Sequence, residues 1–159
     1  MQSPFVGDWV LEIGAGIGNL SNQFIPRELY VVSDTNPRYL HYLCSYAHGK
    51  PYVPVLRIDA TDYVDFAGLK EQFDKVLMIN VLEHASDEQL ALKNVSLALA
   101  AGGRAVILVS SHPGLYGGQD IVLGRWKRYT AAALKNSLEK AGFRVEKLFD
   151  SNRCSVPVW

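Results

Sequence analysis

A glycine-rich turn between a strand-like and a helix-like segment is the feature that most restricts how this chain folds. Residues 11–20 read Leu-Glu-Ile-Gly-Ala-Gly-Ile-Gly-Asn-Leu and continue an apolar run that begins at Trp9. Because Gly14, Gly16 and Gly18 lack Cβ atoms, the backbone can turn tightly there and a ligand can approach the main chain closely. The order of strand, glycine turn and helix predicts a ligand-binding turn rather than a flexible surface loop.

The composition is typical of one soluble globular domain. The chain has 159 residues, of which 48% are hydrophobic, and this is enough for a core of its own. Lys+Arg and Asp+Glu balance at 16 each, so we expect no nucleic-acid partner and no attraction to an anionic membrane. No apolar stretch predicts a membrane span, and the first residues do not resemble a signal peptide. Cys44 and Cys154 have neither disulfide-framework nor metal-binding spacing, which predicts no metal site and a cytoplasmic location.

Strand-like and helix-like segments alternate along the chain. This alternation predicts βαβ units and therefore a doubly wound, mainly parallel, Rossmann-like sheet in a three-layer αβα arrangement. The expected strands are residues 9–13, 29–33, 53–58, 73–79, 104–109 and 143–149. The expected helices are residues 18–24, residues 37–47, a helix between a capping box at 86–89 and the glycines at 102–103, and a last helix from Thr130 to Gly142.

The glycine turn, two acids and a polar cluster follow four successive predicted strands at their carboxyl ends, where parallel sheets bind ligands. Asp34 lies 20 residues after Gly14, and a carboxylate there can accept two hydrogen bonds from a ribose diol. Asp59 follows the third strand and can accept from an exocyclic amine such as that of adenine. A capping role for Asp34 and a solvated loop position for Asp59 are the plainer alternatives. The cluster at residues 80–84 follows the fourth strand, although His84 alone would more often be a structural histidine.

The ordered set of these segments resembles the class I S-adenosylmethionine-dependent methyltransferases. The similar segments are LEIGAGIGNL, VVSDTNP, LRIDAT, FDKVLMINVLEH and AAGGRAVILVS, which together cover roughly residues 10–150. The resemblance implies one methyltransferase domain over residues 1–159 with S-adenosylmethionine as cofactor. The glycine turn would hold its methionine part, Asp34 its ribose and Asp59 its adenine. The cofactor-binding residues implied are Glu12, Gly14, Ala15, Gly16, Gly18, Asn19, Asp34, Thr35, Asp59, Ala60, Asn80 and Val81.

Methyl transfer from a sulfonium is an in-line displacement with a neutral leaving group, so positioning of the two reactants supplies much of the rate. A general base is needed only where the acceptor must lose a proton early. His84 is the first candidate for this catalytic role, and Asp120 and Glu83 are the others. The fourth strand lacks the Asn-Pro-Pro-Tyr or Asp-Pro-Pro-Tyr ending of enzymes that methylate the amino groups of adenine and cytosine. We therefore expect a small-molecule or lipid-like acceptor.

Residues 110–129 have neither a helical nor a strand period, and so long a loop in a small domain is usually functional. Its glycines and aromatic residues favour a lid over a pocket, with a mobile surface loop as the alternative. The segment also resembles a methyltransferase subgroup with a Tyr-Gly…Asp…Gly-His-x-Arg-Arg-Tyr pattern, in which Arg125 replaces the histidine. We expect the acceptor to contact Tyr116, Arg125, Arg128 and Tyr129. The basic residues would meet an anionic group or form a solvated face.

Two alternative functions stay open from the sequence. An NAD(P)-dependent oxidoreductase also combines a glycine turn with an acid about 20 residues later. A non-catalytic cofactor-binding or scaffolding domain would keep the fold without the chemistry. The chain is short at both ends and leaves no room for the family's usual seventh strand, which fits either a fragment or a minimal domain. An exposed sheet edge would then favour homodimer formation.

Overall fold

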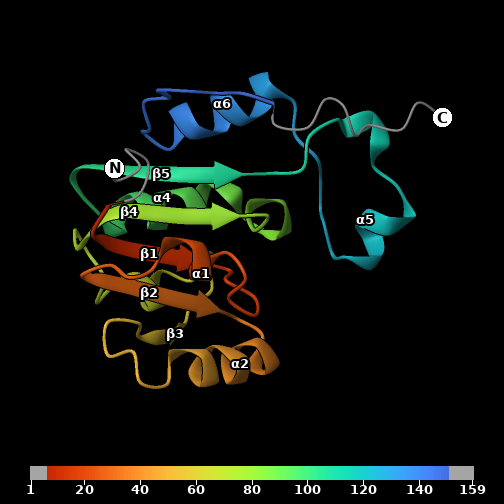
Figure 1. Cartoon of the computed structure of the whole chain (residues 1–159). Helices are drawn as coiled ribbons and strands as arrows, with labels where there is room; N and C mark the ends of the chain where they lie inside the picture. The colour runs from red at the N-terminus through yellow and green to blue at the C-terminus, as the bar shows by residue number, and fades with distance from the viewer. Residues whose placement is uncertain (1–6, 151–159) are drawn as a thin grey trace.

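The computed structural model describes residues 7–150 and contains a five-stranded sheet with helices on both faces (Figure 1). The strand order is β3-β2-β1-β4-β5, and every pairing is parallel. This arrangement confirms the predicted doubly wound αβα fold. The strands are β1 (Trp9–Ile13), β2 (Leu29–Asp34), β3 (Val55–Arg57), β4 (Phe73–Ile79) and β5 (Leu99–Leu108).

Four helices begin at side chains that cap their first turns: α2 (Pro37–Ala47), α3 (Tyr63–Phe66), α4 (Glu88–Ala98) and α6 (Ala131–Lys140). Asn36 accepts a hydrogen bond from the Arg38 N–H before α2, where the sequence predicts a helix to start. Thr130 accepts from the Ala133 N–H and caps α6, as the sequence predicts. The capping box expected at Ser86 is wrong, because Asp87 caps α4 by accepting from the Leu90 N–H. The helices are α1 (Ser21–Phe24), α2 (Pro37–Ala47), α3 (Tyr63–Phe66), α4 (Glu88–Ala98), α5 (Gly118–Val122) and α6 (Ala131–Lys140), with short 3₁₀ helices η1 (Leu82–His84) and η2 (Pro113–Leu115).

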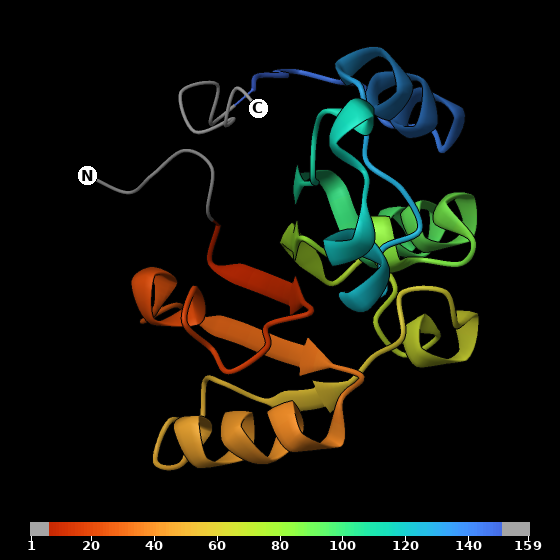
Figure 2. The same ribbon diagram turned by 90° about the vertical axis from the view of Figure 1, so that its right-hand side faces the viewer.

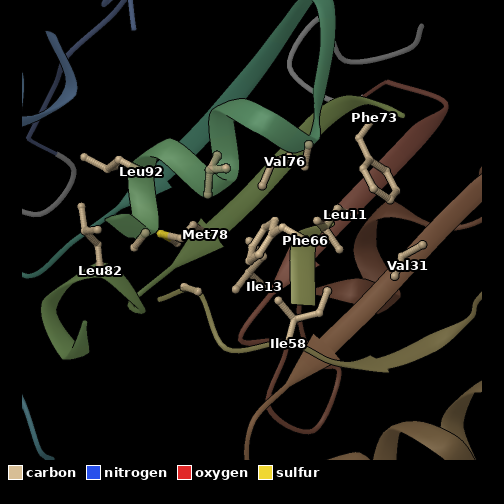
Figure 3. Packing of buried hydrophobic residues seen from close by; sticks show 14 of the residues in the cluster. Leu11, Ile13, Val31, Ile58, Phe66, Phe73, Val76, Met78, Leu82 and Leu92 are labelled. Atoms are coloured by element: carbon tan, nitrogen blue, oxygen red, sulfur yellow. The ribbon is translucent and has the colours of Figure 1, made fainter. Parts of the chain in front are cut away.

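Alternate residues of the central strands face opposite sides of the sheet, and this divides the core into two clusters. Leu11 and Ile13 of β1 pack with Leu92 of α4 on one face (Figure 3). Val10, also in β1, packs with Leu43 of α2 on the other face. All five side chains are almost completely buried. Burial on both faces explains why β1 and β4 are largely apolar in the sequence.

The two glycines expected to end α4 lie instead inside β5. Leu99 pairs with Phe73 at the start of this strand, and a register shift then accommodates extra residues before Arg104 pairs with β4. Gly102 has a φ of +77°, and a Cβ on Gly103 would lie only 2.9 Å from the carbonyl oxygen of Ala100. The glycines therefore shape a bulge in β5, so the helix ends earlier and the strand begins earlier than predicted.

The sixth strand predicted over residues 143–149 is not formed. This segment is tied to β5 by an ion pair between Arg104 and Glu146, with 2.9 Å between Nε and Oε2, and not by backbone pairing. Leu148 and Phe149 are exposed at 41% and 77%. Alternating apolar residues alone do not make a strand, because a strand also needs a neighbour with free backbone groups in register.

The chain reverses its direction of travel across the sheet at β1, which lies between β2 and β4. Parallel α/β sheets bind ligands at the carboxyl ends of strands beside such a switch point. The segment after β5 leaves the sheet at this same end and is not a structureless loop, because it contains η2 and α5. It returns to its starting point, where the Tyr129 N–H donates to the Ser110 carbonyl over 2.8 Å. Within residues 7–150, no helix has the length and apolar character needed to cross a membrane.

Candidate functional site

A cavity of about 600 Å³ opens at the carboxyl ends of the strands. It is lined by nine residues that the sequence predicts for the cofactor or the chemistry: Gly14, Gly16, Asp34, Thr35, Asp59, Ala60, Asn80, Val81 and His84. Sequence reasoning missed the other lining residues, which are Ile13, Asn36, Tyr39, Ile58, Thr61, Ala85, Ser86 and Leu123. The position of Tyr39 could have been predicted, because it lies one helical turn after Asn36 and therefore on the same side of the helix.

The glycine turn forms one wall of this cavity. Gly14 has a φ of +74°, and a Cβ there would lie 2.3 Å from Cγ2 of Val81. Gly16 has a φ of +59°, yet a Cβ there would have no atom within 4 Å. The turn is fixed from behind by a 2.8 Å hydrogen bond from the Ala15 N–H to the Ser33 carbonyl. The main chain at Gly16 therefore borders open space on a rigid support, which suits close approach of a ligand.

Two aspartates stand at the ends of the neighbouring strands. Asp34 is 8% exposed, and its Oδ2 accepts from the Gly16 N–H over 3.0 Å while its Oδ1 accepts from the Asn36 N–H over 2.8 Å. Asp59 Oδ1 accepts from both the backbone N–H and the hydroxyl of Thr61. Each carboxylate is therefore oriented by local hydrogen bonds at the edge of the cavity, which a diol or amine donor can reach.

Four predicted cofactor residues do not line the cavity: Glu12, Ala15, Gly18 and Asn19. Glu12 is 2% exposed and lies behind the glycine turn, where its Oε2 accepts hydrogen bonds from the hydroxyls of Ser21 and Tyr30 over 2.6 and 2.9 Å. Burial raises the pKa of the Glu12 carboxyl, and the two hydrogen bonds only partly oppose this. In the structure Glu12 therefore connects β1 to α1 and β2.

His84 lies on the cavity wall at the end of η1. Its Nδ1 is 3.0 Å from the carbonyl oxygen of Gly124. Since a carbonyl only accepts, Nδ1 carries the hydrogen in this contact, and Nε2 of the neutral ring is left as a proton acceptor. Trp126 holds the same turn, because its Nε1 donates to the His84 carbonyl over 3.1 Å and its N–H donates to the Glu83 carbonyl over 2.8 Å.

Glu83 of η1 and three charged residues beside it pair with one another and do not line the cavity. Asp120 is 1% exposed, and its Oδ1 lies 3.2 Å from Arg125 Nη1 and 3.0 Å from Arg128 Nε. Burial acts to raise the pKa of the Asp120 carboxyl, but hydrogen bonds from Arg128, the Gly117 N–H and Arg125 outweigh it and lower this pKa. Glu83 is completely buried, with Oε1 3.8 Å from Arg125 Nε. The fold thus brings Asp120, Arg125 and Arg128 together as predicted candidates, but they bind one another and form a structural cluster outside the cavity lining.

The two tyrosines predicted to contact the acceptor also hold this segment in place. The Tyr116 hydroxyl donates to the Arg125 carbonyl over 2.9 Å. Tyr129 is 2% exposed, its hydroxyl donates to Glu88 Oε2 over 2.8 Å, and burial raises its pKa above the usual range. From residues 110–129, only Leu123 lines the cavity.

Comparisons with known proteins agree with this geometry. The family profile described as "Methyltransferase domain" matches residues 11–105. A comparison with curated protein sequences finds no match. A Mesorhizobium loti S-adenosylmethionine-dependent methyltransferase has a similar structure, with a TM-score of 0.75 and 17% identity over 91% of this chain and 78% of that one.

Two further solved structures are longer than this chain. The trans-methyltransferase CalH, in complex with SAH, matches with a TM-score of 0.72 and 23% identity over 86% of this chain and 45% of that one. The CurJ carbon methyltransferase matches with a TM-score of 0.72 and 19% identity over 90% of this chain and 43% of that one. The chain thus spans a little under half the length of these two proteins. These likenesses establish the fold, and the profile match over residues 11–105 shows that the chain belongs to the methyltransferase domain family.

Proposed function

We propose that the chain binds S-adenosylmethionine in the cavity and transfers its methyl group to a small-molecule or lipid-like acceptor. The observation that carries this proposal is the convergence of the open glycine turn, Asp34 and Asp59 on one cavity at the switch point of the sheet. An adenosine-containing ligand needs such a pair of acceptors, one for a ribose diol and one for an amine.

The lining residues have complementary roles in this proposal. The main chain at Gly14 and Gly16 faces the methionine part, Asp34 accepts from the ribose hydroxyls, and Asp59 with Ala60 contacts the adenine edge. When bound, S-adenosylmethionine supplies an electrophilic methyl group on a sulfonium. Asn80 is held at a positive φ of 54° at the end of β4, beside the proposed position of that group. A non-glycine residue in this conformation is uncommon and is found preferentially at functional sites.

His84 acts as the general base where the acceptor must lose a proton. Its Nε2 takes the proton, and the Gly124 carbonyl at Nδ1 fixes the ring orientation and stabilises the imidazolium. His84→Gln should lower kcat by about 10²- to 10⁴-fold for such an acceptor and leave cofactor affinity unchanged. A labelled-methyl assay on metabolite and lipid fractions would first identify the acceptor. An unchanged kcat and pH profile would show that His84 is not the base.

The cofactor assignment is tested by isothermal titration calorimetry on Asp34→Ala. Asp62→Ala is a matched control, because both carboxylates accept a backbone N–H two residues further along, and Asp62 is not among the residues that line the cavity. Losing hydrogen bonds to a charged group should weaken binding of S-adenosylmethionine by about 10- to 100-fold in Asp34→Ala only. Equal affinity in both variants would refute the ribose assignment.

Two other results would favour the alternative functions. Tighter binding of NAD than of S-adenosylmethionine in the same calorimetry would favour an oxidoreductase. Binding of S-adenosylmethionine without methyl transfer to any fraction would favour a non-catalytic domain.

A further inference from the structure

We propose that residues 113–126, which we call the arm, dock the protein on a neutral lipid surface from which the acceptor enters the cavity. The identity of the acceptor as a lipid-like molecule rests on the proposed function, whereas the docking itself does not. The arm contains η2 and α5 and connects β5 to α6. It lies beyond the carboxyl ends of the strands, on the side of the molecule that faces the viewer in Figure 2 (Figures 1 and 2).

The surface of the arm is unusually apolar. Val122 is 86% exposed, Trp126 68% and Ile121 66%, which is the reverse of the usual preference of such side chains for the interior. Leu115, Tyr116 and Leu123 are exposed as well. Six large apolar side chains thus lie within twelve consecutive residues. Large exposed apolar side chains gathered on one segment mark an interaction site more often than a solvated loop.

The charged side chains of the arm are turned inward. Asp120 is buried, and Arg125 is only partly exposed because it pairs with Asp120 and lies beside Glu83. Among residues 113–126, all described by the structure, Gln119 is the only exposed side chain that is neither apolar nor aromatic. An arm adapted to water would expose its charges and bury its aliphatic residues, so this arrangement favours an apolar environment.

The arm is rigidly held at the mouth of the cavity. Gly124 and Trp126 are hydrogen-bonded to η1, so the exposed side chains are kept from folding back onto the core. Leu123 belongs to the exposed surface and also lines the cavity. This residue therefore connects the exposed surface of the arm with the cavity of the proposed methyl donor, where a lipid-like acceptor would have to enter.

The size and charge of the arm favour a lipid surface over a protein partner. Six apolar side chains fall well below the roughly 20–30 residues that each partner contributes to a stable protein interface. Leucine, isoleucine, valine and tryptophan side chains insert readily at the boundary between headgroups and acyl chains. With its charges neutralised internally, the arm has no preference for anionic headgroups. We therefore expect binding to zwitterionic lipid.

The test is sedimentation of the full chain with phosphatidylcholine vesicles, with and without phosphatidylserine, at low and high salt. Ile121→Gln/Val122→Gln removes two of the most exposed apolar side chains of the arm. Tyr63→Gln/Val64→Gln is the matched control, because these α3 side chains are also exposed, at 59% and 75%, but lie outside the arm. We expect partitioning of the wild type and the control to be equal, and that of the arm variant to fall about tenfold or more. Neither salt nor phosphatidylserine should change these values.

Three outcomes would overturn the proposal. The first is absence of vesicle binding by the wild-type chain. The second is binding that requires phosphatidylserine and weakens with salt, since this would indicate a basic surface. The third is self-association in light scattering that the arm variant abolishes, since a second copy would then cover the arm. Calorimetry with S-adenosylmethionine on the same preparations separates docking from the proposed function, because either can fail while the other holds.

Discussion

Alanine substitutions at Gly14 and Gly16 should separate two reasons for glycine in the glycine-rich turn after β1. Both residues have positive φ, so either substitution places a Cβ in the left-handed region at a cost of about 1–2 kcal/mol. Only at Gly14 does the new atom overlap a neighbour, since it would lie 2.3 Å from Val81 Cγ2. Valine is stiff at χ1, so this overlap adds about 1–3 kcal/mol of overpacking. Gly14→Ala should therefore cost about 2–5 kcal/mol and Gly16→Ala about 1–2 kcal/mol.

Urea unfolding followed by circular dichroism measures both changes in the free energy of unfolding. Val81→Ala removes the overlapping methyl group, so Gly14→Ala/Val81→Ala should recover about 1–3 kcal/mol relative to the sum of the single variants. Gly16→Ala combined with Val81→Ala should be additive and serves as the control cycle. Equal destabilisation by the two glycine substitutions, or additivity in both cycles, would refute the steric argument.

Three further predictions concern stability. Burial raises the pKa of Glu12 above 4.5, so its contribution to stability falls as pH rises through the folded-state pKa, and Glu12→Gln should raise the urea midpoint at neutral pH. An unchanged midpoint would contradict this. Burial acts to raise the pKa of Glu88, but hydrogen bonds, the largest from Lys127, lower it below 4.5, so stability is lost as pH falls through that lower value. Glu88→Gln should flatten this loss in acid urea titrations, and a profile like the wild type would argue against it. Asp87→Ala should lower the thermal midpoint by an amount equivalent to about 1 kcal/mol and Ser86→Ala by less, and the reverse order would place the cap of α4 at Ser86.

The parts of the fold that could be predicted are those determined by local pattern and burial. The largely apolar runs at residues 9–13 and 73–79 became β1 and β4 with the predicted bounds, because strands covered on both faces are mostly apolar. The end of α4 and the missing strand at 143–149 depend on which backbone groups find a partner. That information lies in the register between distant segments and not in either segment alone.

The residues of the candidate site also fall into those that the sequence predicts and those that it does not. Gly16, Asp34 and Asp59 follow predicted strands, and the topology of a parallel sheet brings them to one edge, so their place on the cavity could be predicted. Arg125 and Asp120 are the residue types that bind ligands, but their mutual distance of 3.2 Å follows only from the folded path of the segment. Charged residues in a loop therefore indicate an interaction without indicating whether the partner is a ligand or another side chain.

The segment after β5 begins and ends at one place, since Ser111 and Tyr129 form an isolated bridge and Tyr129 also bonds to Ser110. This segment can be exchanged as a unit, because a short turn or a segment of different length can join the same two points. The entropy cost of closing the loop changes little with its length. The sheet and its strand ends would not have to rearrange to accept it. Evolution, or a protein engineer, can thus change what reaches the cavity while the strand ends that would bind the proposed methyl donor stay intact.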